Sequence, residues 1–271
     1  MENGATIKID NLFPNNLILC GYRGSFAQNT YIPNRDPDSI DDIDLMGVYL
    51  APPEYYIGLG FTNRTDKRYN KSVERFIDCW DAVSYEMRKF VRLLLKSNPN
   101  VLSLLWIKDE HYFPIIPCPY KEFGKMLVDN RDIFVSKNAY EAFVGYAEEQ
   151  MKKMTHFKKE GYMGEKRKNL VKKYGFDIKN AGHLIRLLKM GIEYLNDGKL
   201  NVFRTDDVDM LIDIKTGKWS LEKVKKEADI LFDAAKDAYE KSPLPEKPDA
   251  EKAEELVMTI IKSYLKEVKN K

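Results

Sequence analysis

The spacing of apolar residues changes near the middle of this 271-residue chain, and this change constrains the fold more than any other feature. Short apolar runs at Asn16–Tyr22, Ile43–Ala51 and Arg75–Val83 end in turn residues, prolines or a polar segment, which is typical of buried strands. A helix with Ser84 as its N-cap is predicted to follow the third strand and to run to Lys96. We therefore expect a small sheet flanked by helices in the first half.

The strong patterns of the second half repeat at i, i+3 and i+4, the spacing of one helix face. Asp177 and Asp249 are predicted N-caps, and Gly198 is predicted to end a helix. The predicted helices are Ala139–Met154, Asp177–Asn196, Ser220–Lys241 and Asp249–Lys269. The sequence thus predicts an α/β protein with a small mixed sheet in residues 1–125 and a helical domain in residues 126–271.

The cysteine content indicates a cellular compartment, whereas the net charge does not indicate a binding partner. Lys and Arg total 44 against 42 Asp and Glu, so the net charge of +2 identifies no partner. The three cysteines follow no CxxC spacing, which favours a reducing compartment over a disulfide framework. We find no apolar run long enough to cross a membrane and no signal peptide, and therefore expect a cytoplasmic protein with no membrane partner.

Two carboxylates in the segment Asp42-Ile43-Asp44 are spaced to share a divalent cation. Residues i and i+2 of a strand point to the same face, so Asp42 and Asp44 project together while Ile43 points into the core. Mg²⁺ binds through one or two carboxylates together with substrate phosphates. The alternative interpretation of so short a motif is an acidic strand edge that faces solvent.

A turn at Arg23-Gly24-Ser25 precedes this motif, at the end of the first predicted strand. Glycine lets the backbone approach a phosphate closely, and the Ser25 hydroxyl can donate to phosphate oxygens. By itself, a Gly-Ser pair after a strand is an ordinary turn. The arrangement found here is a strand, a Gly-Ser turn, a second strand and an Asp-x-Asp motif, in that order. This arrangement resembles that of the DNA polymerase beta superfamily.

This resemblance implies a third acidic residue on the next strand, where Asp78 and Asp81 lie on opposite faces. Asp81 is the better candidate, because it lies nearer the strand end, in a segment resembling the one that follows the third acidic position in relatives. Longer segments, Ser97–Trp106, Tyr174–Met190 and Asn201–Arg204, resemble one branch of the superfamily, the RNA repair pathway DNA polymerase beta family. The resemblance covers roughly residues 16–232 and departs at Ser103, where many relatives carry an acidic residue.

Membership of this branch implies a small mixed β-sheet nucleotidyltransferase core flanked by helices and followed by a helical domain. It implies transfer of a nucleoside monophosphate from a nucleoside triphosphate such as ATP to a hydroxyl acceptor, an RNA end by expectation, with release of pyrophosphate. Two Mg²⁺ ions, or Mn²⁺ in their place, would be held by Asp42, Asp44 and Asp81. The predicted nucleotide-binding residues are Arg23, Gly24, Ser25, Lys179, His183, Arg186 and Arg204.

Two basic features suggest further contacts with phosphate groups. Lys179, His183 and Arg186 occupy positions i, i+4 and i+7 of one helix, so they share a face that a triphosphate could contact; a solvated face with a core histidine is the alternative. Residues 151–173 hold nine Lys and Arg with interleaved aromatics, which indicates RNA or DNA contact or an ordinary surface loop.

The sequence leaves two other functions open. One is a non-catalytic nucleotide- or RNA-binding module, or a toxin–antitoxin partner, that retains the fold. The other is the same chemistry on a protein or small-molecule acceptor.

Overall fold

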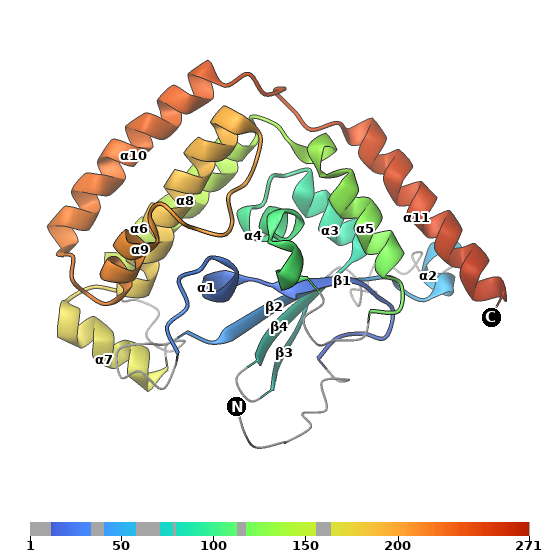
Figure 1. The fold of residues 1–271 in the computed structure, drawn as a ribbon, viewed down its shortest axis with the longest axis horizontal. Coiled ribbons are helices and arrows are strands. Elements are labelled where there is room, and N and C mark those ends of the chain that lie inside the picture. Colours follow the sequence, from blue (N-terminus) through green and yellow to red (C-terminus); the bar gives the residue numbers. More distant parts are fainter. Residues whose placement is uncertain are drawn as a thin grey trace.

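The computed structural model describes residues 12–33, 41–57, 71–77, 80–112, 118–155 and 164–270. Four strands in these ranges form one mixed sheet in the order β1-β2-β4-β3 (Figure 1). The central strands β2 and β4 are parallel, and each outer strand is antiparallel to its neighbour. The strands are β1 (Leu17–Tyr22), β2 (Ile43–Tyr49), β3 (Val73–Ile77) and β4 (Trp80–Glu86).

Helices cover one face of this sheet and build the second half of the molecule (Figure 1). The first half contributes α1 (Gly24–Ala27), α2 (Pro53–Ile57), α3 (Met87–Leu94), α4 (Pro99–Ser103) and α5 (Lys121–Asp129). The second half contributes α6 (Ala139–Thr155), α7 (Glu165–Tyr174), α8 (Ile178–Asp197), α9 (Val208–Lys215), α10 (Leu221–Lys241) and α11 (Ala250–Asn270). None of the described helices combines the length and apolarity needed to cross a lipid bilayer. The predicted fold class is confirmed.

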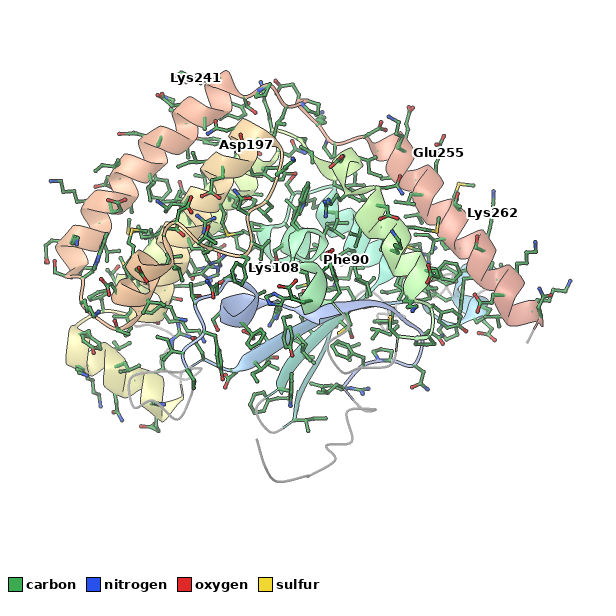
Figure 2. The ribbon with its side chains drawn as sticks, viewed as in Figure 1. Phe90, Lys108, Asp197, Lys241, Glu255 and Lys262 are labelled. Atoms are coloured by element: carbon green, nitrogen blue, oxygen red, sulfur yellow. The ribbon has the colours of Figure 1, made fainter. Side chains whose placement is uncertain are left out.

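The two faces of the sheet pack against different hydrophobic clusters, as the alternation of strand side chains requires. Met46 and Val83 join the large cluster that continues into the helices, where Phe90 of α3 is completely buried (Figure 2). Leu45 and Ala82, one residue away on each strand, join a smaller cluster on the opposite face. The even-numbered positions of β2 and the odd-numbered positions of β4 therefore face the helices.

The prediction of a single strand over Arg75–Val83 is wrong. Ile77 pairs with Trp80 in an antiparallel register, so the chain reverses between them and forms β3 and β4. The segment Arg75–Val83 is mostly apolar and contains no Gly or Pro, so no turn signal marks the reversal in the sequence. Ser84 lies inside β4, and the N-cap of α3 is Glu86, whose carboxylate accepts a hydrogen bond from the Lys89 N–H.

The four helices predicted in the second half are confirmed to within a residue or two at their ends. The Asp177 carboxylate accepts hydrogen bonds from the N–H groups of Lys179 and Asn180, and Asp249 caps α11 through the Lys252 N–H. Gly198 ends α8 in the left-handed conformation, with φ of 68°. Sequence reasoning did not predict α5, α7 or α9.

Helix α11 returns to the first half of the molecule and packs beside α3 and α5 (Figure 1). The Tyr264 hydroxyl accepts a hydrogen bond of 3.0 Å from the Asn16 side chain, and its ring contacts Tyr120 edge-on. The large hydrophobic cluster includes residues of both halves. The domain boundary near residue 125 stays a prediction, but the packing of α11 does not follow it.

Candidate active site

The parallel register of β2 and β4 brings two aspartates side by side. Asp44 pairs with Asp81, and both lie on the sheet face that carries Met46 and Val83. Asp42 immediately precedes β2. Asp78, the other candidate for the third acidic residue, lies outside the described residues. The predicted proximity of Asp81 to Asp44 is thus present, and its cause is strand pairing.

Gly24 packs directly against the Asp44 carboxylate. A Cβ atom at this position would lie 2.1 Å from Asp44 Oδ2, and the φ angle of Gly24 is +62°, so both space and backbone conformation require glycine. The Arg23 N–H, one residue earlier, donates a 2.9 Å hydrogen bond to the Asp44 carbonyl. The Gly-Ser turn is therefore held against the first strand aspartate.

The Arg23 guanidinium is shared by both carboxylates of the pair. Its Nη2 atom lies 3.6 Å from Asp44 Oδ1 and 3.7 Å from Asp81 Oδ2. Burial raises the pKa of Asp44 to about 6; Arg23 and Lys179 oppose this rise, and the charges of Asp81 and Asp42 add to it. The described residues contain no group of three or more His, Cys, Asp or Glu side chains placed to hold a metal ion. We predicted that three carboxylates converge. Among the described residues, the structure instead has a pair, Asp44 and Asp81, that shares the Arg23 guanidinium.

A cleft of about 290 Å³ opens beside this pair, between the Gly-Ser turn and α8. Asp44 is on its wall, whereas Asp42, Asp81 and Arg204 are not among its lining residues. Six of the predicted nucleotide-binding residues line it: Arg23, Gly24, Ser25, Lys179, His183 and Arg186. The predicted orientation of the Lys179–Arg186 helix face, toward Asp44 and away from bulk solvent, is therefore what the structure has.

Arg186 is buried without a carboxylate in contact, as far as the described residues show. Its side chain donates to the Met190 sulfur at 3.0 Å, and the residue is 9% exposed. Burial, and secondarily repulsion from Arg204, lowers the pKa of Arg186 to about 9. A guanidinium in this position is a strong hydrogen-bond donor group that an anion in the cleft could use.

His183 contributes an imidazole to the same wall. Its Nε2 atom is buried and has no hydrogen-bond partner within the described part of the chain. Burial, reinforced by the neighbouring cations Arg186 and Lys179, lowers the pKa of His183 well below 6.5. The ring is consequently neutral at pH 7, and one of its nitrogens is available as a donor or an acceptor to a ligand.

Sequence reasoning missed an ion pair on the cleft wall between Lys215 of α9 and Asp41. The Asp41 carboxylate is 2% exposed and accepts from both Lys215 Nζ and the Ile32 N–H. Lys215 Nζ also donates to the Thr30 carbonyl at 2.7 Å. The acidic segment before β2 is a general signal for a cationic partner, but nothing in the sequence distinguishes Asp41 from its neighbours. Helix α9, which carries the partner, was not predicted.

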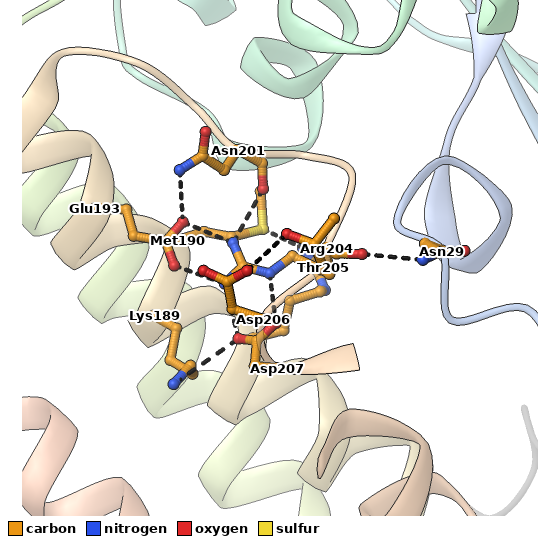
Figure 3. A network of polar contacts seen from close by, with 10 residues as sticks. Asn29, Lys189, Met190, Glu193, Asn201, Arg204, Thr205, Asp206 and Asp207 are labelled. Carbon is orange, nitrogen blue, oxygen red and sulfur yellow. Dashed lines mark hydrogen bonds and ion pairs between the residues drawn. The ribbon is translucent and has the colours of Figure 1, made fainter. Parts of the chain in front are cut away.

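Arg204 lies in a buried polar network outside the cleft (Figure 3). Its guanidinium forms a bidentate contact with Asp207, at 2.8 and 2.7 Å, and a second one with Glu193, at 2.7 and 2.6 Å. The remaining N–H donates to the Asn201 carbonyl at 3.0 Å. All five donors are thus used, so the geometry does not support the prediction that Arg204 contacts a nucleotide.

The same loop is attached by its backbone to the turn that follows α1. The Arg204 N–H donates to the Gln28 carbonyl at 3.2 Å, and the Asn29 side chain donates to the Arg204 carbonyl at 3.0 Å (Figure 3). Asn29 itself has a φ of 60°, a conformation that Asn tolerates better than most residues. The Arg204 network therefore fixes the position of the helical half relative to the Gly-Ser turn.

The basic segment 151–173 is described only in part. Residues 151–155 end α6, residues 165–173 lie in α7, and residues 156–163 are outside the described ranges. Arg167 of α7 forms a 2.7 Å ion pair with the buried Asp177 carboxylate, which assigns one of the nine cations a structural contact. Nucleic-acid contact by this segment stays a prediction.

A mixed sheet with paired aspartates, a Gly-Ser turn and a helical half that closes a cationic cleft defines the class of α/β nucleotidyltransferase folds. The model of the RNA repair pathway DNA polymerase beta family matches residues 36–259, and the chain belongs to this family. The match includes both strand aspartates and α8 but begins after the Gly-Ser turn. A search of the curated proteins found no match.

Proposed function

We propose that this protein is a Mg²⁺-dependent nucleotidyltransferase that transfers a nucleoside monophosphate from a nucleoside triphosphate to a hydroxyl acceptor. The observation that carries the proposal is the position of Asp44, next to Asp81 on one side and on the wall of a cleft that contains Lys179 and Arg186 on the other. Carboxylates for a metal ion and cations for a polyphosphate are thus neighbours, as this chemistry requires.

Asp42, Asp44 and Asp81 would hold the metal, with Mn²⁺ as an alternative ion. Asp44 and Asp81 support this role: their carboxylates lie on adjacent strands and face the same way, and the cationic group of Arg23 already lies 3.6 and 3.7 Å from them. Oxygen ligands of this kind suit Mg²⁺, which takes its remaining ligands from phosphates and water. When bound, the metal would activate the attacking hydroxyl and neutralise charge on the departing pyrophosphate.

The cleft wall would bind the triphosphate. Lys179 and Arg186 are two helical turns apart, about 10 Å by helix rise, which is comparable with the length of an extended triphosphate. Gly24 and Ser25 would approach the phosphates from the opposite wall. In the reaction the acceptor oxygen bonds to the α-phosphorus, the bond to the bridging oxygen breaks, and pyrophosphate leaves; the protein supplies mainly positioning and charge.

Titration calorimetry with Mg²⁺ and ATP tests the site. Wild-type protein should bind the metal–nucleotide complex, and Asp42→Asn and Asp44→Asn should lose the metal-dependent part of that binding. Asp233→Asn, which changes an exposed carboxylate of α10, is the matched control and should bind normally. Equal binding by the Asp44→Asn variant and the wild type would refute the proposed role.

A second assay asks what the enzyme modifies. Incubation with each α-labelled nucleoside triphosphate, Mg²⁺ and total RNA should transfer label to RNA ends. Label on protein or on a small molecule instead would keep the chemistry and change the acceptor. Metal-dependent nucleotide binding with no labelled product from RNA, cell proteins or small metabolites would favour the non-catalytic alternative.

A further inference from the structure

Phe76 is an exposed aromatic residue on β3, the edge strand of the sheet. It is 64% exposed, and it belongs to neither hydrophobic cluster, whereas its strand neighbours Val73 and Ile77 pack against the smaller one. Burial in the core therefore gives no reason for a phenylalanine here. A single exposed apolar residue is ordinary on a protein surface, so any role of Phe76 depends on where it lies relative to the aspartate pair.

The register places Phe76 in one row with the aspartate pair. Phe76 pairs with Asp81 on β4, and Asp81 pairs with Asp44 on β2. Side chains of directly paired residues project from the same face of a sheet. The aromatic ring thus lies next to Asp81, on the face that carries both carboxylates, at the β3 edge.

The nucleotide cleft lies at the other end of this row. Gly24 of α1 packs against Asp44, and the cleft wall, which includes Asp44 but not Asp81, continues from Asp44 to α8. The strand order β1-β2-β4-β3 separates this side from the edge at Phe76 (Figure 1). The aspartate pair is therefore flanked by a cationic cleft on one side and an exposed aromatic on the other.

The chemistry of phosphoryl transfer assigns roles to these two sides. The attacking and leaving oxygens are roughly in line through the phosphorus, so acceptor and pyrophosphate lie on opposite sides of the metal site. If the cationic cleft holds the triphosphate, the acceptor hydroxyl comes from the β3 side. The group that carries this hydroxyl then lies within reach of Phe76.

We propose that Phe76 is a stacking platform for the 3′-terminal base of a single-stranded nucleic-acid acceptor. This inference rests on the proposed function and names the acceptor class for the same site. Aromatic rings stack on unpaired bases with little dependence on sequence, because every base has a π face. A ring at the acceptor side of the metal carboxylates would hold the last nucleotide with its hydroxyl toward Asp81, in agreement with the RNA repair assignment of the family.

The test uses a single-stranded oligoribonucleotide with 2-aminopurine at its 3′ end, whose fluorescence falls when the base stacks. With wild-type protein we expect binding with strong quenching. Phe76→Ala should abolish most of the quenching and weaken binding by roughly 5- to 150-fold, the range that stacking of one base supports. Phe76→Trp should restore both, and Ile230→Ala, which truncates an exposed apolar residue on α10, should change neither.

An oligonucleotide with an abasic 3′-terminal residue identifies the contact. If Phe76 stacks on the terminal base, Phe76→Ala should have little further effect on this weaker ligand, because the partner of the ring is already absent. Equal effects on both oligonucleotides, wild-type binding by Phe76→Ala, or no binding of the strand by the wild-type protein would overturn the inference. The proposed function fails separately, by the loss of metal-dependent nucleotide binding in the calorimetric assay.

Discussion

Arg186, a residue of α8, and Arg204, which contacts α8 through Glu193, are both buried, yet their surroundings differ. Arg204 has carboxylates on two sides and uses every N–H donor within the protein (Figure 3). Arg186 lies on the cleft wall and donates to a methionine sulfur, with no carboxylate in contact among the described residues. Sequence reasoning assigned both to nucleotide binding, because both are cations in segments that resemble the family.

The hydrogen-bond partners of a buried guanidinium therefore indicate whether its role is structural or ligand-binding. A guanidinium whose donors are all satisfied stabilises the structure around it and has nothing left for a ligand. A guanidinium buried without an anion destabilises the free protein, and an anionic ligand offsets that cost when it binds. By this criterion Arg204 positions the two halves of the molecule, and Arg186 is a ligand-binding group.

The largest expected effect is on stability, through Arg204→Ala. This change leaves the Asp207 and Glu193 carboxylates without their buried partner, so the free energy of unfolding should fall by about 3–5 kcal/mol. Urea unfolding followed by circular dichroism measures it. Lys241→Ala breaks an exposed ion pair with Asp237 and should leave the unfolding midpoint unchanged. A loss below about 1 kcal/mol for Arg204→Ala would remove the contrast between the two arginines.

In contrast to Arg204→Ala, the Arg186→Met variant should lose ATP affinity without losing stability. Removing a buried charge that has no anionic partner should leave the free energy of unfolding unchanged or raise it. ATP binding, however, should weaken by roughly 10- to 150-fold, the equivalent of one hydrogen bond to a charged group. Calorimetry with Mg²⁺ and ATP, together with urea unfolding, separates the two effects. Normal ATP affinity, or destabilisation as large as that of Arg204→Ala, would show that Arg186 is a structural residue.

The smallest effect should come from Asn29→Ala, at the link between the Arg204 network and the Gly-Ser turn. The variant loses the hydrogen bond to the Arg204 carbonyl and places alanine at a positive φ, for a combined cost of about 1–2 kcal/mol. Asn29→Gly loses the hydrogen bond but tolerates the backbone conformation, so its loss should be smaller. If both variants are as stable as the wild type, the attachment of the turn does not depend on this side chain.

Local patterns were enough to predict several parts of the candidate site. The i, i+4, i+7 spacing placed Lys179, His183 and Arg186 on one face of α8, and all three line the cleft. This prediction succeeded geometrically because it depends on the period of a single element, which the sequence encodes directly. The i, i+2 spacing placed Asp44 in β2, whereas Asp42 lies just before the strand and does not line the cleft. Their roles in metal and nucleotide binding stay predictions.

The periodicity of single elements did not predict which elements pair with one another. The β3–β4 reversal aligns Phe76 with Asp81, and the fold of α9 brings Lys215 to Asp41 across 174 residues of sequence. Nothing in either segment indicates its partner, because the partner is chosen by strand register and helix packing. Arg204 shows the same limit, since only the neighbours supplied by α8 and α9 reveal that its donors are used.

The sequence by itself determined the four long helices of the second half, with their ends, because propensity, capping and periodicity are local properties. Its motifs also indicated the family to which the chain belongs. The tertiary structure alone decided which charged groups are paired within the protein and which face the cleft. That distinction depends on distance and burial, because the energy of a buried charge is set by whichever groups the fold places around it. It separates Arg186 from Arg204, two residues that the sequence presents as equivalent.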